Sequence, residues 1–131
     1  MTVQKLNPPQ IAKPVAHYSH LAVVPEGHRL LILSGQVGSA ADGGFPDVLE
    51  AQFELALANA LAVAAAEGAG PDDVAKVTYY LTERPTDLRR IGTAIRAAFP
   101  GTPPASTFLI ISGLAGPQMK VEVEIVAAVK A

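Results

Sequence analysis

Apolar residues along the chain occur either in short continuous runs or at helical spacing. The run Leu21–Val24 is followed, after the turn-forming Pro25-Glu26-Gly27, by a second run from Arg29 to Ser34. Two such runs joined by a tight turn predict a β-hairpin. The second run is apolar at consecutive positions, which predicts a strand buried on both faces.

Two later stretches repeat apolar residues about every 3.6 positions, the spacing of an amphipathic helix. The first begins at Asp47, with Glu50 at capping-box spacing, and Gly68 suits its C-terminal end. We expect Thr86 to cap the second helix and Pro100-Gly101 to stop it. The predicted buried stripes are Leu49, Phe53, Leu57, Leu61 and Ala64 in the first helix, and Leu88, Ile91, Ile95 and Ala98 in the second.

Three further segments have the pattern of strands. Residues Lys76–Thr82 alternate, Thr107–Ile111 are continuously apolar, and Val121–Val129 begin by alternating with Glu122 and Glu124 pointing outward. Residues 7–16 contain three prolines, which predict an extended and irregular N-terminal segment.

The predicted order of elements is ββαβαββ, an α+β fold. Two amphipathic helices cover only one face of a sheet. The runs Leu31–Leu33 and Phe108–Ile111 nevertheless offer apolar side chains to both faces. A monomer would leave the second apolar face in water, so we expect it to be buried against other copies of the chain.

Composition and charge narrow the class of protein further. The 131 residues fit one domain spanning 1–131, and a net charge of −2 does not favour nucleic acid or an anionic membrane as partner. The chain has no cysteine, which excludes disulfides and thiolate chemistry. His17 and His20, three apart near a strand, would point to opposite faces, so a metal bound by this pair is not expected. We also expect no cofactor. No apolar signal or membrane-length segment is evident, so we predict a cytoplasmic protein.

An ordered set of short motifs resembles the RidA (YjgF) family, also labelled endoribonuclease L-PSP, over roughly residues 15–129. The motifs are Tyr18-Ser19, Ser34-Gly35-Gln36-Val37, the helix with Gln52 and Asn59, Gly68-Ala69-Gly70, Val74-x-x-Val77-Thr78, Gly113-Leu114-Ala115 and Val121-Glu122-Val123-Glu124. The resemblance implies a chorismate-mutase-like fold, a homotrimer, and small-molecule clefts between subunits. It also implies hydrolysis of reactive enamines and imines, such as 2-aminoacrylate, to keto acids and ammonia.

The resemblance implies a set of site residues. Glu122 matches the carboxylate that positions the attacking water, Tyr18 matches an aromatic residue near the mouth of the cleft, and Gly35 matches backbone that lines it. Ser106, Thr107 and Phe108 stand where the family binds its substrate. From the strand pattern alone Glu122 is a solvated residue, Tyr18 a packing residue, and Ser106 and Thr107 satisfy backbone at the start of a strand.

The chain departs from the family pattern at several of these positions. Active members carry an Arg after a Pro-Ala pair, which holds the substrate carboxylate in a bidentate fork, but here Pro104-Ala105 is followed by Ser106. Gly92 and Ile95 replace an Asn and a Tyr, and Phe108 replaces a smaller side chain. These changes make activity on 2-aminoacrylate doubtful, and the sequence leaves open whether another arginine, such as Arg96, reaches the cleft.

Three hypotheses follow for function. The first is a hydrolase or deaminase of an enamine-like, imine-like or other small substrate, which uses Glu122 and water, with Ser106 in place of the clamp. The second is a trimer that binds a small metabolite between subunits without turnover. The third is an accessory trimer that serves another enzyme.

Overall fold

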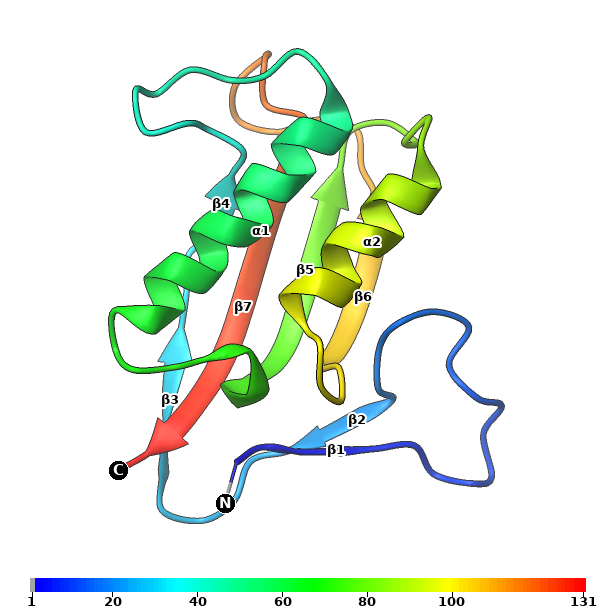
Figure 1. The fold of residues 1–131 in the computed structure, drawn as a ribbon, viewed down its shortest axis with the longest axis vertical. Helices are drawn as coiled ribbons and strands as arrows, with labels where there is room; N and C mark the ends of the chain where they lie inside the picture. The colour runs from blue at the N-terminus through cyan, green and yellow to red at the C-terminus, as the bar shows by residue number, and fades with distance from the viewer. Residues whose placement is uncertain (1) are drawn as a thin grey trace.

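The structure, a computed structural model, describes residues 2–131 and has two layers, a β-sheet with both long helices on one face (Figure 1). The helices α1 (Leu49–Ala65) and α2 (Leu88–Ala98) lie across that face. One turn of 3-10 helix, Pro71–Asp73, precedes β5. The strands are β1 (Gln4–Leu6), β2 (Leu21–Val23), β3 (His28–Ile32), β4 (Gln36–Val37), β5 (Val74–Leu81), β6 (Ala105–Ile110) and β7 (Val121–Lys130).

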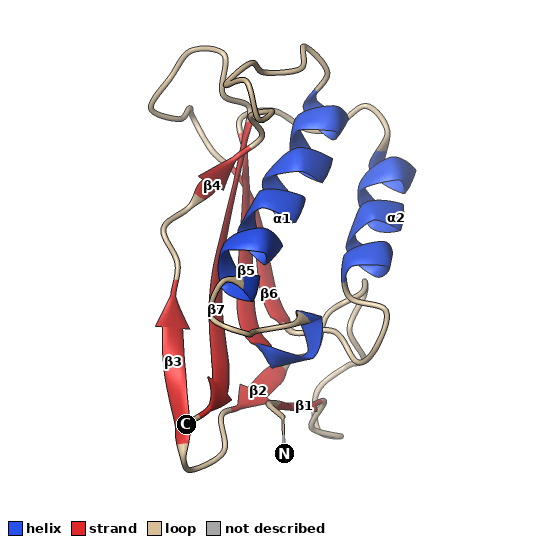
Figure 2. Cartoon of the chain, turned by 60° about the vertical axis from the view of Figure 1, so that its left-hand side comes forward, coloured by secondary structure: helices blue, strands red, loops and turns tan. Residues whose placement is uncertain are grey.

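The main sheet has the strand order β3-β7-β5-β6, with β4 also paired to β7. Strands β5 and β6 are parallel because α2 forms the crossover between them, whereas β7 is antiparallel to β3, β4 and β5. The sheet is therefore mixed, and both helices cover one of its faces (Figure 2). The predicted α+β class is confirmed.

The core lies between α1 and the two central strands, β5 and β7. Alternate residues of these strands point toward the helices, and Phe53 stacks on Tyr79 with ring centroids 5.2 Å apart. Alanines at positions 56, 60 and 64 of α1 are buried, so the helix approaches the sheet closely. The strand residues that face it are Val77, Tyr79, Leu81, Val121, Val123, Ile125 and Ala127.

The predicted hairpin between residues 21–24 and 29–34 is wrong. Strand β2 pairs with β1, with Leu6 opposite Leu21, whereas β3 pairs with β7, with Leu31 opposite Ala127. The turn at Gly27 therefore passes the chain from one sheet to another. The two-stranded sheet of β1 and β2 lies near one end of the main sheet, where Val3, Ala75 and Ala128 form a second small core (Figure 1).

Both predicted helix caps are also wrong. Helix α1 begins at Leu49 without a side-chain cap, and the buried Glu50 instead accepts hydrogen bonds from the backbone N–H groups of Thr86 and Asp87, both at 3.0 Å. The cap of α2 is Asp87, which accepts from the backbone N–H of Arg90 at 3.0 Å. Glu50 therefore organises the start of the other helix. The predicted end of α1 is confirmed, since Gly68 has a positive φ of 85° and Ala69 N–H bonds back to Ala64 O.

The predicted burial of both faces of β3 is not met within one chain. Leu31 packs against the core, but Leu30 and Ile32, on the face away from the helices, are 57% and 71% exposed. Leu109 of β6 is also exposed. The sheet thus has an uncovered face with apolar side chains, as the sequence predicts. No helix within residues 2–131 is long and apolar enough to cross a membrane.

Candidate functional site

A cavity of about 480 Å³, here called the α2–β6 pocket, lies where α2, β6 and the N-terminal segment meet. Three of the residues predicted for the site, Tyr18, Ser106 and Phe108, line it together. Leu88, predicted as part of the core stripe of α2, is 66% exposed and lines this pocket instead. The other lining residues are Val15, Ala16, His17, Tyr79, Ile91, Gly92 and Ile95.

Hydrogen bonds from the N-terminal segment hold its side of the pocket in place. His17 Nε2 donates to the carbonyl of Phe99, just after α2, at 2.7 Å. Ser19 Oγ donates to the Pro103 carbonyl at 2.6 Å, and Ser19 N–H donates to Pro104 O at 3.0 Å. Because Tyr18 lies between these two anchors, it is held beside the start of β6. His17 could not be placed here from the sequence, because its hydrogen-bond partner Phe99 is 82 residues away.

Phe108 closes the side of the pocket nearest the core. Its ring lies 5.7 Å from that of Tyr79 and 6.2 Å from that of Phe53, centroid to centroid. Since side chains alternate along a strand, Ser106 also points to the helix side of the sheet, and Thr107 points to the other side. Thr107 accordingly accepts a hydrogen bond from Lys76 Nζ at 2.7 Å and is not among the lining residues.

Every departure from the family pattern noted in the sequence lies in this one pocket. Gly92 and Ile95 come from α2, and Ser106 and Phe108 come from β6. The lining of eleven residues includes no Lys, Arg, Asp or Glu. The pocket is therefore mostly apolar, with the hydroxyls of Tyr18 and Ser106 among its few polar groups.

Glu122 and Gly35, the remaining predicted site residues, lie elsewhere. Glu122 stands between the buried Val121 and Val123, so its side chain points to the uncovered face of the sheet. A Cβ atom placed on Gly35 would lie 2.5 Å from Glu122 Oε2, which shows that the carboxylate rests directly over this glycine. Within one chain, the predicted site residues therefore lie on both faces of the sheet.

The uncovered face carries further polar contacts near Glu122. Tyr80 lies opposite Glu122 on the neighbouring strand, and its hydroxyl donates a short hydrogen bond to the Glu124 carboxylate. This bond is the main reason that the pKa of Tyr80 is raised above its ordinary value. Within residues 2–131, no group of three His, Asp, Glu or Cys side chains is placed to hold a metal ion.

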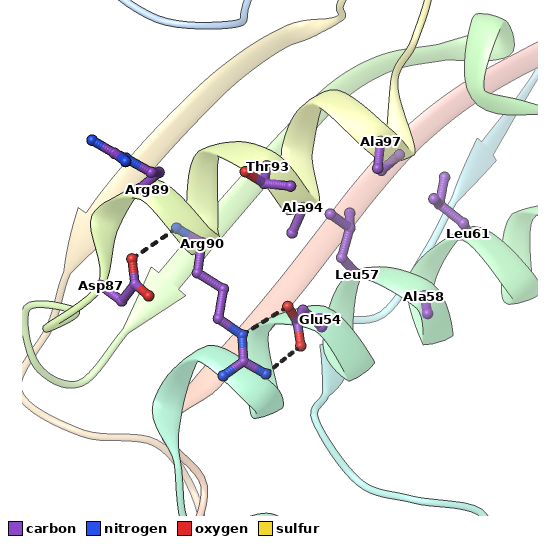
Figure 3. A pocket seen from close by; sticks show the side chains of 11 residues that line it. Glu54, Leu57, Ala58, Leu61, Asp87, Arg89, Arg90, Thr93, Ala94 and Ala97 are labelled. Atoms are coloured by element: carbon purple, nitrogen blue, oxygen red, sulfur yellow. Dashed lines mark hydrogen bonds and ion pairs between the residues drawn. The ribbon is translucent and has the colours of Figure 1, made fainter.

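A second hollow of about 670 Å³ lies between α1 and α2 on the outside of the helical layer (Figure 3). Two hydrogen bonds join Arg90 to the Glu54 carboxylate at 2.7 and 2.9 Å across it. The Arg90 guanidinium lowers the pKa of Glu54. Most other lining residues are Ala or Leu, and this hollow contains no residue that was predicted for the site.

Comparison with known proteins agrees with the motifs. Residues 9–129 match the family model for endoribonuclease L-PSP. The RutC family protein YjgH of Escherichia coli is 33% identical over 109 residues, which cover 82% of each chain. The structure of YyfB from Yersinia pestis, described as a member of the conserved Rid family, is 31% identical and has a TM-score of 0.87, covering 98% of this chain and all of the other.

More distant structures share the fold. RidA from an Antarctic Psychrobacter species is 23% identical with a TM-score of 0.69, over 96% of this chain and 99% of that one. The family match covers nearly the whole chain, and two relatives exceed 30% identity over most of its length. The chain therefore belongs to the endoribonuclease L-PSP family, the group that includes the RidA (YjgF) proteins.

Proposed function

We propose that the chain forms a cytoplasmic homotrimer of single-domain subunits that binds a small imine-like or enamine-like metabolite in the α2–β6 pocket and hydrolyses it. The observation that carries this proposal is the meeting of Tyr18, Ser106 and Phe108 around one cavity, as expected for the substrate-binding wall of the family. An apolar cavity with a few placed polar groups suits a small organic ligand.

Two copies are needed to complete the site. Ser106 points to the helix side of the sheet and Glu122 to the uncovered side, so the two side chains of one chain cannot face a common ligand. We infer that a neighbouring copy supplies the Glu122 that faces the pocket, and that the exposed apolar residues Leu30 and Ile32 form part of the surface where copies pack. This requirement supports an inter-subunit cleft.

The reaction needs no cofactor, because the imine carbon is already electrophilic. The Glu122 carboxylate accepts a proton from a water molecule as the water oxygen forms a bond to the imine carbon. That proton passes to the imine nitrogen to give a carbinolamine, whose hydroxyl then gives its proton to the nitrogen as the C–N bond breaks, so that ammonia leaves a carbonyl compound. The family label names an endoribonuclease, but a net charge of −2 does not favour RNA as the substrate.

An assay with imines generated in situ by an amino-acid oxidase tests the proposal. The chain should accelerate imine loss, and Glu122→Gln should reduce that acceleration by about 100-fold or more, the usual contribution of a general base. Glu26→Gln, in an exposed turn, is the matched control and should retain the full rate. If Glu122→Gln is as active as the unaltered chain, Glu122 is not the base.

A second candidate is binding without turnover. It is favoured by the replacement of the family arginine with Ser106 and by the absence of charged residues among the eleven that line the pocket. Ser106→Arg separates the two candidates. If the unaltered chain is inert and Ser106→Arg gains activity on imino acids, the cleft is intact but its natural ligand is bound without that reaction.

A further inference from the structure

The guanidinium group of Arg96 occupies the space beside Gly92 at the α2–β6 pocket. Both residues lie on one face of α2 because they are four positions apart. A Cβ atom placed on Gly92 would lie 3.3 Å from both Nη1 and Nη2 of Arg96, and 3.7 Å from Cζ. The missing side chain at Gly92 therefore leaves room for the arginine to fold back along the helix, toward its N-terminus.

Arg96 has no other partner in the part of the chain that the structure describes. Its guanidinium makes no ion pair or hydrogen bond with any of residues 2–131, and the side chain is exposed. The other two arginines of α2 line the hollow between the two helices, not the α2–β6 pocket. Arg90 is paired with Glu54, and Arg89 lines the hollow between the helices. Arg96 is thus the α2 arginine placed beside Gly92.

Position and charge together define a kind of ligand. Gly92 forms part of the pocket wall and Arg96 itself does not, so the guanidinium beside Gly92 lies next to an uncharged, mostly apolar cavity. We infer that Arg96 binds the carboxylate of a small ligand whose apolar body fills the α2–β6 pocket, and so supplies from α2 the positive charge that Ser106 lacks. This inference rests on the proposed function of the pocket.

The polar groups at the α2–β6 pocket favour a ligand with a carboxylate over one with a phosphate. One guanidinium offers two parallel N–H donors, which match the two oxygens of a carboxylate. A phosphate monoester carries more charge and more acceptor oxygens than the remaining wall can satisfy. The ring Nε2 of His17 is already bonded to the Phe99 carbonyl, which leaves the hydroxyls of Tyr18, Tyr79 and Ser106 among the lining side chains.

Calorimetric titration of the full-length, assembled protein with a pair of probes tests this inference. Isovalerate and isovaleramide share a branched apolar body, but only isovalerate carries a charge. The unaltered chain should bind isovalerate about tenfold more tightly, the effect of one charge-assisted contact. Arg96→Gln should abolish this preference, whereas Arg89→Gln, at an exposed arginine two helical turns earlier that lines the hollow between the helices, should keep it.

Each of the other outcomes would overturn a specific part of the inference about Arg96. If Arg96→Gln retains the preference for isovalerate, Arg96 is not the anion contact. If isobutyl phosphate binds more tightly than isovalerate through Arg96, the ligand class is wrong. If both isovalerate and isovaleramide bind equally well to the unaltered chain, the inference fails while the pocket stands. If neither binds, the proposed ligand site fails with it.

Discussion

Glu122 and Gly35 are in such close contact that no side chain fits between them. The carboxylate of Glu122, on β7, rests over the glycine that follows β3, and a Cβ atom on Gly35 would lie 2.5 to 2.8 Å from three atoms of the Glu122 side chain. Real Cβ atoms do not approach other heavy atoms so closely. Gly35 therefore determines where the Glu122 carboxylate lies.

Gly35→Ala should displace the Glu122 carboxylate while leaving the fold intact. The atoms that must move are the end of a flexible side chain, not backbone, so we expect a small loss of stability. A displacement of about 1 Å is enough to reduce catalysis by about 100-fold. The rate of imine loss measures the effect on catalysis, and thermal unfolding measures the effect on stability.

Gly113→Ala is the matched control, because a Cβ atom there would meet nothing within 4 Å. Its rate should equal that of the unaltered chain. Equal rates for Gly35→Ala and the unaltered chain would show that the position of Glu122 does not matter for the reaction.

Glu50 joins the two helices and should control stability in acid. Its side chain is buried and accepts three hydrogen bonds, from the backbone N–H and hydroxyl of Thr86 and from the backbone N–H of Asp87. The Asp87 N–H is the main cause that lowers the pKa of this carboxyl below its ordinary value of 4.5. The stabilising effect is therefore complete above about pH 4.5 and is lost as the pH falls through the lower, folded pKa.

Glu50→Gln should destabilise the protein by about 2 kcal/mol at neutral pH, because charged hydrogen bonds are replaced by weaker neutral ones. The difference in stability between the variant and the unaltered chain should shrink below pH 4. Urea unfolding at pH 7 and pH 3.5 gives both values. Glu67→Gln, in an exposed ion pair with Arg29, should change stability little at either pH.

The elements with strong periodicity could be predicted from the sequence, but the partners of the strands could not. Helix α1 and strands β5, β6 and β7 were predicted within a few residues, because their apolar patterns reflect one buried face. The hairpin prediction failed because a turn such as Pro25–Gly27 fixes only local direction. Strand β1 was missed because three residues, Gln4–Leu6, carry too little pattern.

Caps and the site depend on long-range contacts, which explains why they were harder to predict. Glu50 has the spacing of a local cap, yet its partners lie 36 and 37 residues away. The family motifs assign Tyr18, Ser106 and Phe108 to one predicted site, and in the structure all three line the same pocket. The motifs did not show that Thr107 lies on the other face, which follows from alternation once β6 is placed.

The hydroxyl of Tyr79 is buried without a hydrogen-bond partner among the described residues, so its removal should stabilise the protein. An unsatisfied buried hydroxyl costs about 1–3 kcal/mol, whereas the ring itself stacks well on Phe53. Tyr79→Phe keeps the ring and should increase the free energy of unfolding by about 1 kcal/mol. Urea unfolding at pH 7 provides the measurement, and a loss of stability would show that a water or ligand satisfies this hydroxyl.

Tyr79 should also affect the stability of the protein at alkaline pH. Burial raises the pKa of Tyr79 above its ordinary value of 10.0. Above pH 10 the unfolded chain has lost a proton that the folded chain retains, so stability falls as the pH rises. Tyr79→Phe removes this contribution and should lose less stability than the unaltered chain between pH 9 and pH 11. If the free energies of unfolding of the two proteins fall equally between pH 9 and pH 11, burial does not raise the pKa of Tyr79.

The uncovered face of the sheet should hold the assembled protein together. Ile32 is 71% exposed in a single chain, and a substitution at so exposed a position would normally cost less than about 0.5 kcal/mol. If this face packs against another copy, Ile32→Glu instead buries an unpaired charge at the interface. We therefore expect Ile32→Glu to shift the protein from the proposed trimer to a monomer, as measured by light scattering after size-exclusion chromatography.

Val48→Glu provides the control for this change, since Val48 is 51% exposed but lies at the start of α1, on the helical side. It should leave the trimer intact. Because the proposed site combines Ser106 of one copy with Glu122 of another, dissociation by Ile32→Glu should also abolish imine hydrolysis, although both side chains remain in place in each chain. A monomeric variant with the full rate would show that one chain contains the whole site, and a trimeric Ile32→Glu variant would show that the copies meet elsewhere.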